Sequence, residues 1–110
     1  MIIGGEDRTL KFGLNQSALY CELRDISIKQ MNMDIQRIAQ GDGNGSEIRD
    51  MIWSALKDGA RVDKQAFEFD HFEVGDWLEE VDTNEMAVAI KELALSMPVA
   101  KKKAAEKAKK

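Results

Sequence analysis

Hydrophobic residues follow two different periods along this chain of 110 residues. Near the beginning, the stretch LKFGL at residues 10–14 alternates large apolar residues with Lys and Gly, which is the two-residue period of a half-buried strand. The preceding stretch, IIGGED at residues 2–7, ends in a turn-forming cluster. A lone hairpin is only marginally stable in water. The pattern therefore predicts a β-hairpin over residues 1–14 with its apolar face packed on helices.

From residue 15 onward, apolar residues recur at the three- and four-residue spacing of amphipathic helices. Ser, Asn and Asp residues, which accept amide hydrogen bonds at helix starts, divide this part into five segments. The N-cap candidates, in chain order, are Asn15 or Ser17, Ser27, Ser46, Asp70 and Asp82. Ser27 and the two aspartates also have Gln or Glu three residues later, which is the spacing of a capping box. About five short helices are therefore expected.

Each expected helix carries an apolar stripe that would face a common core. The third is expected to end at Gly59, placed as a C′ glycine, and the last at Pro98, the only proline. The sequence thus predicts an α+β fold that is mainly α, with the hairpin and the helices of residues 15–97 around one core. Residues 1–98 would form a single globular domain and residues 99–110 a flexible basic tail. The stripes are Leu19, Leu23 and Ile26; Ile28, Met31, Ile35 and Ile38; Ile48, Met51, Ile52, Ala55 and Leu56; Val74, Trp77, Leu78 and Val81; and Met86, Ala87, Ile90, Leu93, Ala94 and Met97.

Charge is distributed unevenly along the chain. The last ten residues, KKKAAEKAKK, hold six lysines and one glutamate, a net charge of +5. Since the whole chain carries −4, the first hundred residues carry −9. An acidic body repels phosphates, so specific nucleic-acid binding is not expected. No signal peptide is evident, and no apolar run approaches the roughly 20 residues that cross a bilayer. With one cysteine and hence no internal disulfide, the chain is expected to be a cytosolic protein without membrane contact.

The stretch EFDHFEVGDWLEE at residues 68–80 combines the only histidine, His71, with six carboxylates. A histidine among acids can form a metal site or an acid/base centre. No second histidine or cysteine completes a zinc set, however, and Asp70 with Glu73 has the spacing of a capping box. The remaining acids lie opposite the apolar stripe of this helix. We therefore interpret the stretch as a capped amphipathic helix without a catalytic or metal-binding role.

Three other features suggest chemistry but fit structural roles better. The stretch GDGNG at residues 41–45 lacks the preceding strand of a dinucleotide fingerprint, and Glu47 and Trp53 occupy the positions where a calcium loop needs Gly and Glu. Cys21 has no histidine within reach in the sequence, so a partly buried side chain is expected. Met33 lies off the stripe of its helix, and a core position is favoured over an adaptable binding surface. No catalytic, cofactor-binding or metal-ligating residue is therefore expected.

Several motifs, taken in order, resemble phage tail assembly chaperones. Residues 3–19 contain IGG, TLKFGLN and AL in the arrangement of that family's opening hairpin and first helix. The stretch IWSALKDGA at residues 52–60 is similar to the family's W-A-L-K-x-G helix, and EVGDWL at residues 73–78 is similar to its later E-V-G-D-W-L helix. A final helix that closes on SMP at residues 96–98 also matches. The resemblance covers most of residues 1–98, whereas the glycine-rich loop and the lysine tail are not diagnostic.

The resemblance implies a non-enzymatic protein without a cofactor that acts in the cytoplasm of a bacterial host. Such chaperones bind the long, helical tape measure protein, keep it soluble until tail-tube subunits polymerise around it, and are absent from the virion. Apolar faces would cover the client's stripes while the acidic exterior keeps the assembly in solution. Weak self-association is expected, because many copies cover one client. The family often makes a longer product by frameshifting, for which the codons of Lys101–Lys103 or Lys109–Lys110 are candidates.

Three alternatives stay open from the sequence. The first is a virion structural protein, such as a head–tail connector or a minor tail protein, or another small protein-interaction domain. The second is a small hydrolase or metal-dependent enzyme that uses His71 and Asp76. The third is nucleic-acid binding through residues 101–110, with a steeply salt-dependent affinity. No partner-binding residues are assigned, because the motifs that carry the resemblance are expected to form core.

Overall fold

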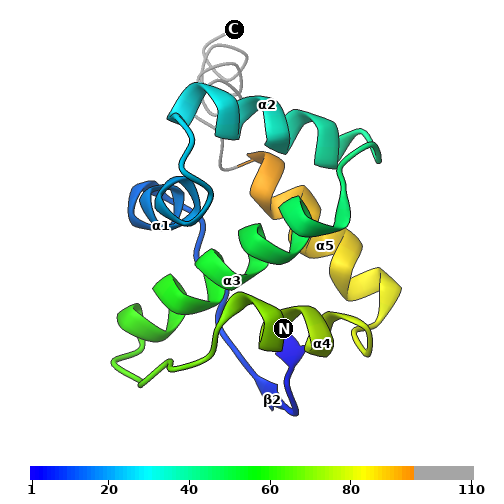
Figure 1. The fold of residues 1–110 in the computed structure, drawn as a ribbon. Coiled ribbons are helices and arrows are strands. Elements are labelled where there is room, and N and C mark those ends of the chain that lie inside the picture. Colours follow the sequence, from blue (N-terminus) through cyan, green and yellow to red (C-terminus); the bar gives the residue numbers. More distant parts are fainter. Residues whose placement is uncertain (96–110) are drawn as a thin grey trace, which may run out of the picture.

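The structure, a computed structural model, describes residues 1–95. Within them, a short antiparallel hairpin precedes five helices, so the predicted mainly α architecture is confirmed (Figure 1). The longest helix, α3, runs through the middle, and the other helices surround it. The expected helix end at Pro98 and the expected flexible tail lie outside the described residues. The elements are β1 (Ile2–Ile3), β2 (Glu6–Asp7), α1 (Leu14–Arg24), α2 (Ile28–Ala39), α3 (Gly45–Val62), α4 (His71–Leu78) and α5 (Thr83–Leu95).

The hairpin is shorter than the alternating pattern predicts. β1 pairs antiparallel with β2, and the turn uses Gly4 and Gly5 at φ values of 63° and 80°, which glycine adopts without strain. The predicted strand over residues 10–14 is wrong. This stretch crosses α3 instead, and the backbone amide of Lys11 donates to the carbonyl oxygen of Ala55 at 3.1 Å. Leu10 and Phe12 pack against the core clusters without pairing with another strand, whereas Leu14 is exposed.

Capping side chains begin three of the helices as predicted. Ser27 accepts a hydrogen bond from the backbone amide of Gln30 at 3.1 Å, and Asp70 accepts one from the amide of Glu73 at 2.8 Å. Asp82 accepts from the amides two and three residues further along the chain. These bonds satisfy amides that have no partner inside the first turn of a helix.

The predicted caps of α1 and α3 are wrong. The N-cap of α3 is Asn44 and not Ser46, since the Asn44 side chain accepts from the amide of Glu47 at 3.0 Å and the Glu47 side chain accepts in return. α1 begins directly after Gly13, so both proposed caps lie inside the helix. The hydroxyl of Ser17 donates back to the carbonyl oxygen of Gly13 at 2.8 Å instead of accepting an amide hydrogen bond.

α3 also continues past the residue that was expected to end it. It runs on to Val62, so Gly59 lies within the helix and is not a C′ glycine. The glycine serves a close approach instead, because a Cβ atom at this position would lie 2.0 Å from the carbonyl oxygen of Thr9. The missing side chain allows the N-terminal segment to cross α3 in direct contact with its backbone.

Buried apolar side chains form two clusters, and Ile48 of α3 packs against both. The first cluster joins α1, α2, α3 and α5, and the second joins the hairpin, α3, α4 and α5. Val74 and Trp77 of the EVGDWL stretch belong to the second cluster, so the stripe of that helix faces the core as predicted. The buried members are Tyr20, Met31, Ile35, Ile38, Met51 and Leu93 in the first cluster, and Ile3, Ile52, Leu56, Val74 and Ala89 in the second.

Candidate functional site

The histidine–carboxylate stretch places aromatic rings beside its histidine. His71 is half-buried, its ring meets Trp53 edge-on at a centroid distance of 6.5 Å, and it lies 4.3 Å from the ring of Phe72. Asp70 caps the helix, and Asp76 is exposed. Among residues 1–95, no group of three or more His, Cys, Asp or Glu side chains is arranged to hold a metal ion. The geometry of this stretch is that of a capped helix packed through its aromatic rings.

The other sequence candidates occupy ordinary positions. Cys21 is half-buried, as predicted. Its burial, and to a smaller extent the negative charge of Asp34, raise the pKa of the thiol. A raised pKa lowers the fraction of thiolate, which is the form that acts as a nucleophile. Met33 is 51% exposed, so the favoured core position is wrong, because this residue points away from the stripe that α2 buries. Residues 41–44 of the GDGNG stretch lie in the loop between α2 and α3, as predicted, whereas its last glycine, Gly45, is already the first residue of α3.

The most concentrated charge lies inside the molecule, and the sequence interpretation missed it. Four carboxylates are at most 3% exposed: Asp34, Glu47, Asp50 and Asp58. A buried carboxylate is costly unless it is paired and hydrogen-bonded. A signal was available in the sequence for two of them, because Arg37 follows Asp34 by three residues and Arg61 follows Asp58 by three.

Arg37 joins two of these carboxylates between α2 and α3. Its guanidinium donates to both oxygens of Glu47 at 2.9 and 2.7 Å, and to Oδ1 of Asp34. The Gln30 amide also donates to Oδ1 of Asp34 at 2.9 Å, and the Tyr20 hydroxyl donates to Oδ2 at 2.9 Å. Burial opposes ionisation of Asp34, but these hydrogen bonds outweigh it and lower the pKa of the carboxyl group below its usual range. Burial and the bond to Asp34 together raise the pKa of Tyr20.

The two other buried carboxylates, both on α3, are paired in the same way. Asp50 accepts a hydrogen bond from Arg24 of α1 at 2.7 Å. Asp58 accepts from Arg61 at 2.7 Å and lies 3.5 Å from the ammonium group of Lys11. Each buried carboxylate in the described part of the chain thus has a basic partner. The arrangement is suited to fixing the helices and the N-terminal segment to one another, and it offers no free carboxylate to act as a general base.

Asp34→Asn is expected to make the protein less sensitive to acid. The folded-state pKa of Asp34 is lowered, so its contribution to stability is complete above the unfolded-state pKa of about 4 and is lost as the pH falls through the folded-state pKa. Urea unfolding midpoints measured from pH 7 to pH 3 should therefore fall less steeply in the variant than in the wild type. Parallel curves for the two proteins would contradict this assignment.

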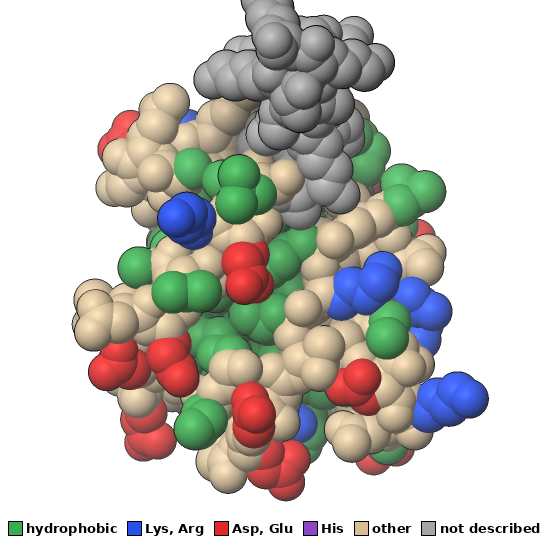
Figure 2. Space-filling view, turned by 180° about the vertical axis from the view of Figure 1, so that it is seen from behind, with side chains coloured by type: hydrophobic (Ala, Val, Ile, Leu, Met, Phe, Trp, Pro, Cys, Tyr) green, Lys and Arg blue, Asp and Glu red, His purple; other side chains and the backbone are tan. Residues whose placement is uncertain are grey.

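A groove on the surface lies between the N-terminal segment and α5. It has a volume of about 570 Å³, which is in the range of ligand and peptide sites. Figure 2 shows hydrophobic side chains gathered at the middle of this face, with Asp and Glu side chains mainly below and to the left of them and Lys and Arg side chains on the right. Residues 7–10 form one wall. The other wall is two turns of α5, which contribute Glu85, Val88, Ala89 and Glu92 at helical spacing.

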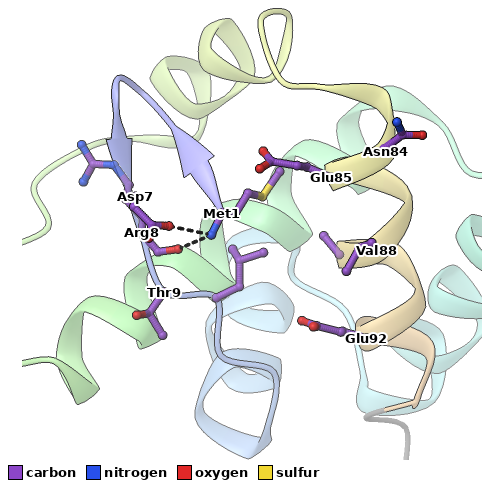
Figure 3. A pocket seen from close by; sticks show the side chains of 10 residues that line it. Met1, Asp7, Arg8, Thr9, Asn84, Glu85, Val88 and Glu92 are labelled. Atoms are coloured by element: carbon purple, nitrogen blue, oxygen red, sulfur yellow. Dashed lines mark hydrogen bonds and ion pairs between the residues drawn. The ribbon is translucent and has the colours of Figure 1, made fainter.

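The charge that faces this groove is mainly negative. Glu85 and Glu92 point from α5 toward the N-terminal segment (Figure 3), and neither has a cationic partner within residues 1–95. Asp7 pairs with the amino group of Met1 at 3.0 Å. The side chain of Arg8 turns away from the groove, and its guanidinium stacks over the rings of Phe69 and Trp77 at 5.2 and 4.8 Å. The groove therefore combines an apolar floor with an acidic rim.

Neither a membrane-spanning helix within residues 1–95 nor a similar known protein was found for this chain. No helix in the described part of the chain has the length and apolar character needed to span a membrane. Comparison with protein-family models, with curated proteins and with solved structures gave no match.

Proposed function

We propose that the protein is a non-enzymatic phage tail assembly chaperone, which binds the tape measure protein and keeps it soluble in the host cytoplasm while the tail assembles. The proposal rests on the ordered motifs that resemble this family, and on one structural observation. Within residues 1–95, the four stretches IGG, TLKFGLN, IWSALKDGA and EVGDWL contact one another. They share one buried cluster of the fold, which supports taking the motifs as a combination.

Two glycines make these contacts. A Cβ atom at Gly4 of the IGG motif would lie 2.7 Å from the ring of Trp77 in EVGDWL. A Cβ atom at Gly59 of IWSALKDGA would lie 2.0 Å from the backbone of Thr9 in TLKFGLN. In each pair of motifs, one supplies the glycine and the other supplies the group that leaves no room for a Cβ atom there. A family whose members share this fold would keep these positions together, which supports the use of the motifs as a combination.

The surface is compatible with the proposed mechanism. Large apolar side chains that are at least 44% exposed occur on β1 and on all five helices, and the acidic body keeps such a surface in solution. A long, helical client would be covered by several copies, each contributing a small contact area. Weak self-association on the client belongs to this proposal.

Co-expression with the tape measure protein encoded beside it tests the proposal. The soluble fraction of the client should rise several-fold with this chain, and the two should co-elute on gel filtration. An unrelated helical protein of similar size and charge is the matched control. A client that stays insoluble with or without this chain would exclude the chaperone function.

Mass spectrometry of purified virions addresses the main alternative, because a connector or minor tail protein would be found there and a chaperone would not.

A further inference from the structure

We propose that the groove between residues 7–10 and α5 is the binding site for a partner helix that carries an apolar stripe flanked by Lys or Arg. The proposal rests on the chaperone function only in naming the tape measure protein as the source of that helix. The chemistry of the partner follows from the groove itself.

The shape of the groove favours an extended, helical occupant. The α5 residues that line it run from Asn84 to Glu92, which is about 12 Å at a rise of about 1.5 Å per residue. A partner helix lying along this wall would present apolar side chains at positions i, i+3 or i+4, and i+7, the usual pattern of recognition in a groove. Ala89 lies between Asn84 and Glu92 and is buried in the second core cluster, so it anchors this wall of the groove to the core.

The apolar floor requires a partner with large hydrophobic side chains. Val88 is 57% exposed and points into the groove, where it stands opposite the segment that contains Leu10. A single exposed valine on a flat surface needs no explanation. Here the exposed side chain lies in a concavity. One partner side chain inserted there would bury apolar surface of both the N-terminal segment and α5.

The rim determines the charge of the partner. Glu85 and Glu92 stand one on each side of Val88 along α5, and Arg8, which also lines the groove, has its guanidinium over the Trp77 ring and bonded to the Ile3 carbonyl oxygen. Lysines or arginines that flank an apolar stripe would meet these two carboxylates. An acidic helix would be repelled by them, so the rim selects the partner as well as attracting it.

The chain's own lysine segment is a poorer match. Residues 101–110 carry six lysines, which suit the rim, but they contain no apolar side chain larger than alanine. Such a segment would leave the floor of the groove uncovered. The groove therefore fits a partner helix better than the chain's own terminus.

Titration of the full-length ¹⁵N-labelled protein with three synthetic helical peptides tests the proposal. The first peptide has leucines at i, i+4 and i+7 with flanking lysines, the second has glutamates in place of the lysines, and the third has alanines in place of the leucines. Only the first should bind, and the amide signals that move should be those of residues 7–10 and 84–92. Signals that move instead around Phe72 and Met86, in the smaller hollow of about 430 Å³, would overturn the proposal.

Charge reversal separates the groove from the rest of the acidic surface. The Glu85→Lys/Glu92→Lys variant should bind the first peptide about tenfold more weakly, whereas the matched Glu22→Lys/Glu68→Lys variant, which changes exposed acids outside the groove, should lose no more than about twofold. Equal losses in the two variants would overturn the proposal. A separate experiment deletes residues 101–110 and records the spectrum without peptide. If the amide signals of Thr9 and Glu85 move, the chain's own segment occupies the groove, and the proposal is overturned.

The groove and the chaperone function can fail separately. If the peptide binds in the groove but the tape measure protein stays insoluble, the chaperone function is wrong and the partner helix has another source. If the groove variant with two lysines still solubilises the tape measure protein fully, the chaperone function stands and the groove is not its client site.

Discussion

Replacing Gly59 with alanine should destabilise the fold by about 3 kcal/mol or more, which is a large part of the stability of a small domain. The added Cβ atom would lie 2.0 Å from the carbonyl oxygen of Thr9 and 2.7 Å from its carbonyl carbon, which are backbone atoms that cannot rotate away. Relief of this clash requires the N-terminal segment to move off α3. That movement would also break the bond between Lys11 and Ala55 nearby. Urea unfolding followed by circular dichroism measures the loss.

Gly45→Ala is the matched control in the same helix. Gly45 begins α3, and no atom outside its immediate neighbours lies within 4 Å of the position where its Cβ would be. Alanine has the higher helix propensity, so this variant should be unchanged or more stable by up to about 1 kcal/mol. If both variants were equally stable, the close crossing of Thr9 over α3 would be wrong.

The two glycines also show which features of the fold a sequence can predict. Helix starts at Ser27, Asp70 and Asp82 depend on side chains that bind amides two or three residues away, so local patterns identify them. The role of Gly59 within α3 depends on Thr9, about fifty residues earlier in the chain. A glycine near an expected helix end resembles a cap in the sequence, and only the three-dimensional crossing shows that it serves a contact.

The groove was unpredictable from the sequence for the same reason. Its walls come from residues 7–10 and from α5, which are more than seventy positions apart, and the first wall lies in a stretch that was expected to be a strand. Glu85 was interpreted through its capping-box spacing alone. The buried acids were also missed, since charged residues are assigned to solvent unless a partner is visible. Arg37 follows Asp34 by three residues and Arg61 follows Asp58 at the same spacing, so these two pairs were close enough in sequence to be found.

Tyr20→Ala should produce a loss of similar size, about 4 kcal/mol, for two reasons. The ring is fully buried in the first core cluster, so its removal leaves a cavity between α1 and the helices around it. The hydroxyl also donates to Asp34 at 2.9 Å, so its loss leaves a buried carboxylate oxygen without that partner. For a domain of this size, the melting temperature should fall by at least about 15 °C.

Tyr20→Phe separates the two contributions, because it keeps the ring and removes only the hydroxyl group. This variant should lose about 1–2 kcal/mol at pH 7. The bond from Tyr20 helps to lower the pKa of Asp34, so without it the folded-state pKa rises toward the unfolded value. The deficit should therefore shrink as the pH falls from the unfolded-state pKa of about 4 through the lower folded-state pKa of Asp34, where the carboxylate of the folded wild type becomes protonated as well. A deficit that is the same at pH 7 and pH 3 would show that the hydroxyl acts through packing and not through the charge of Asp34.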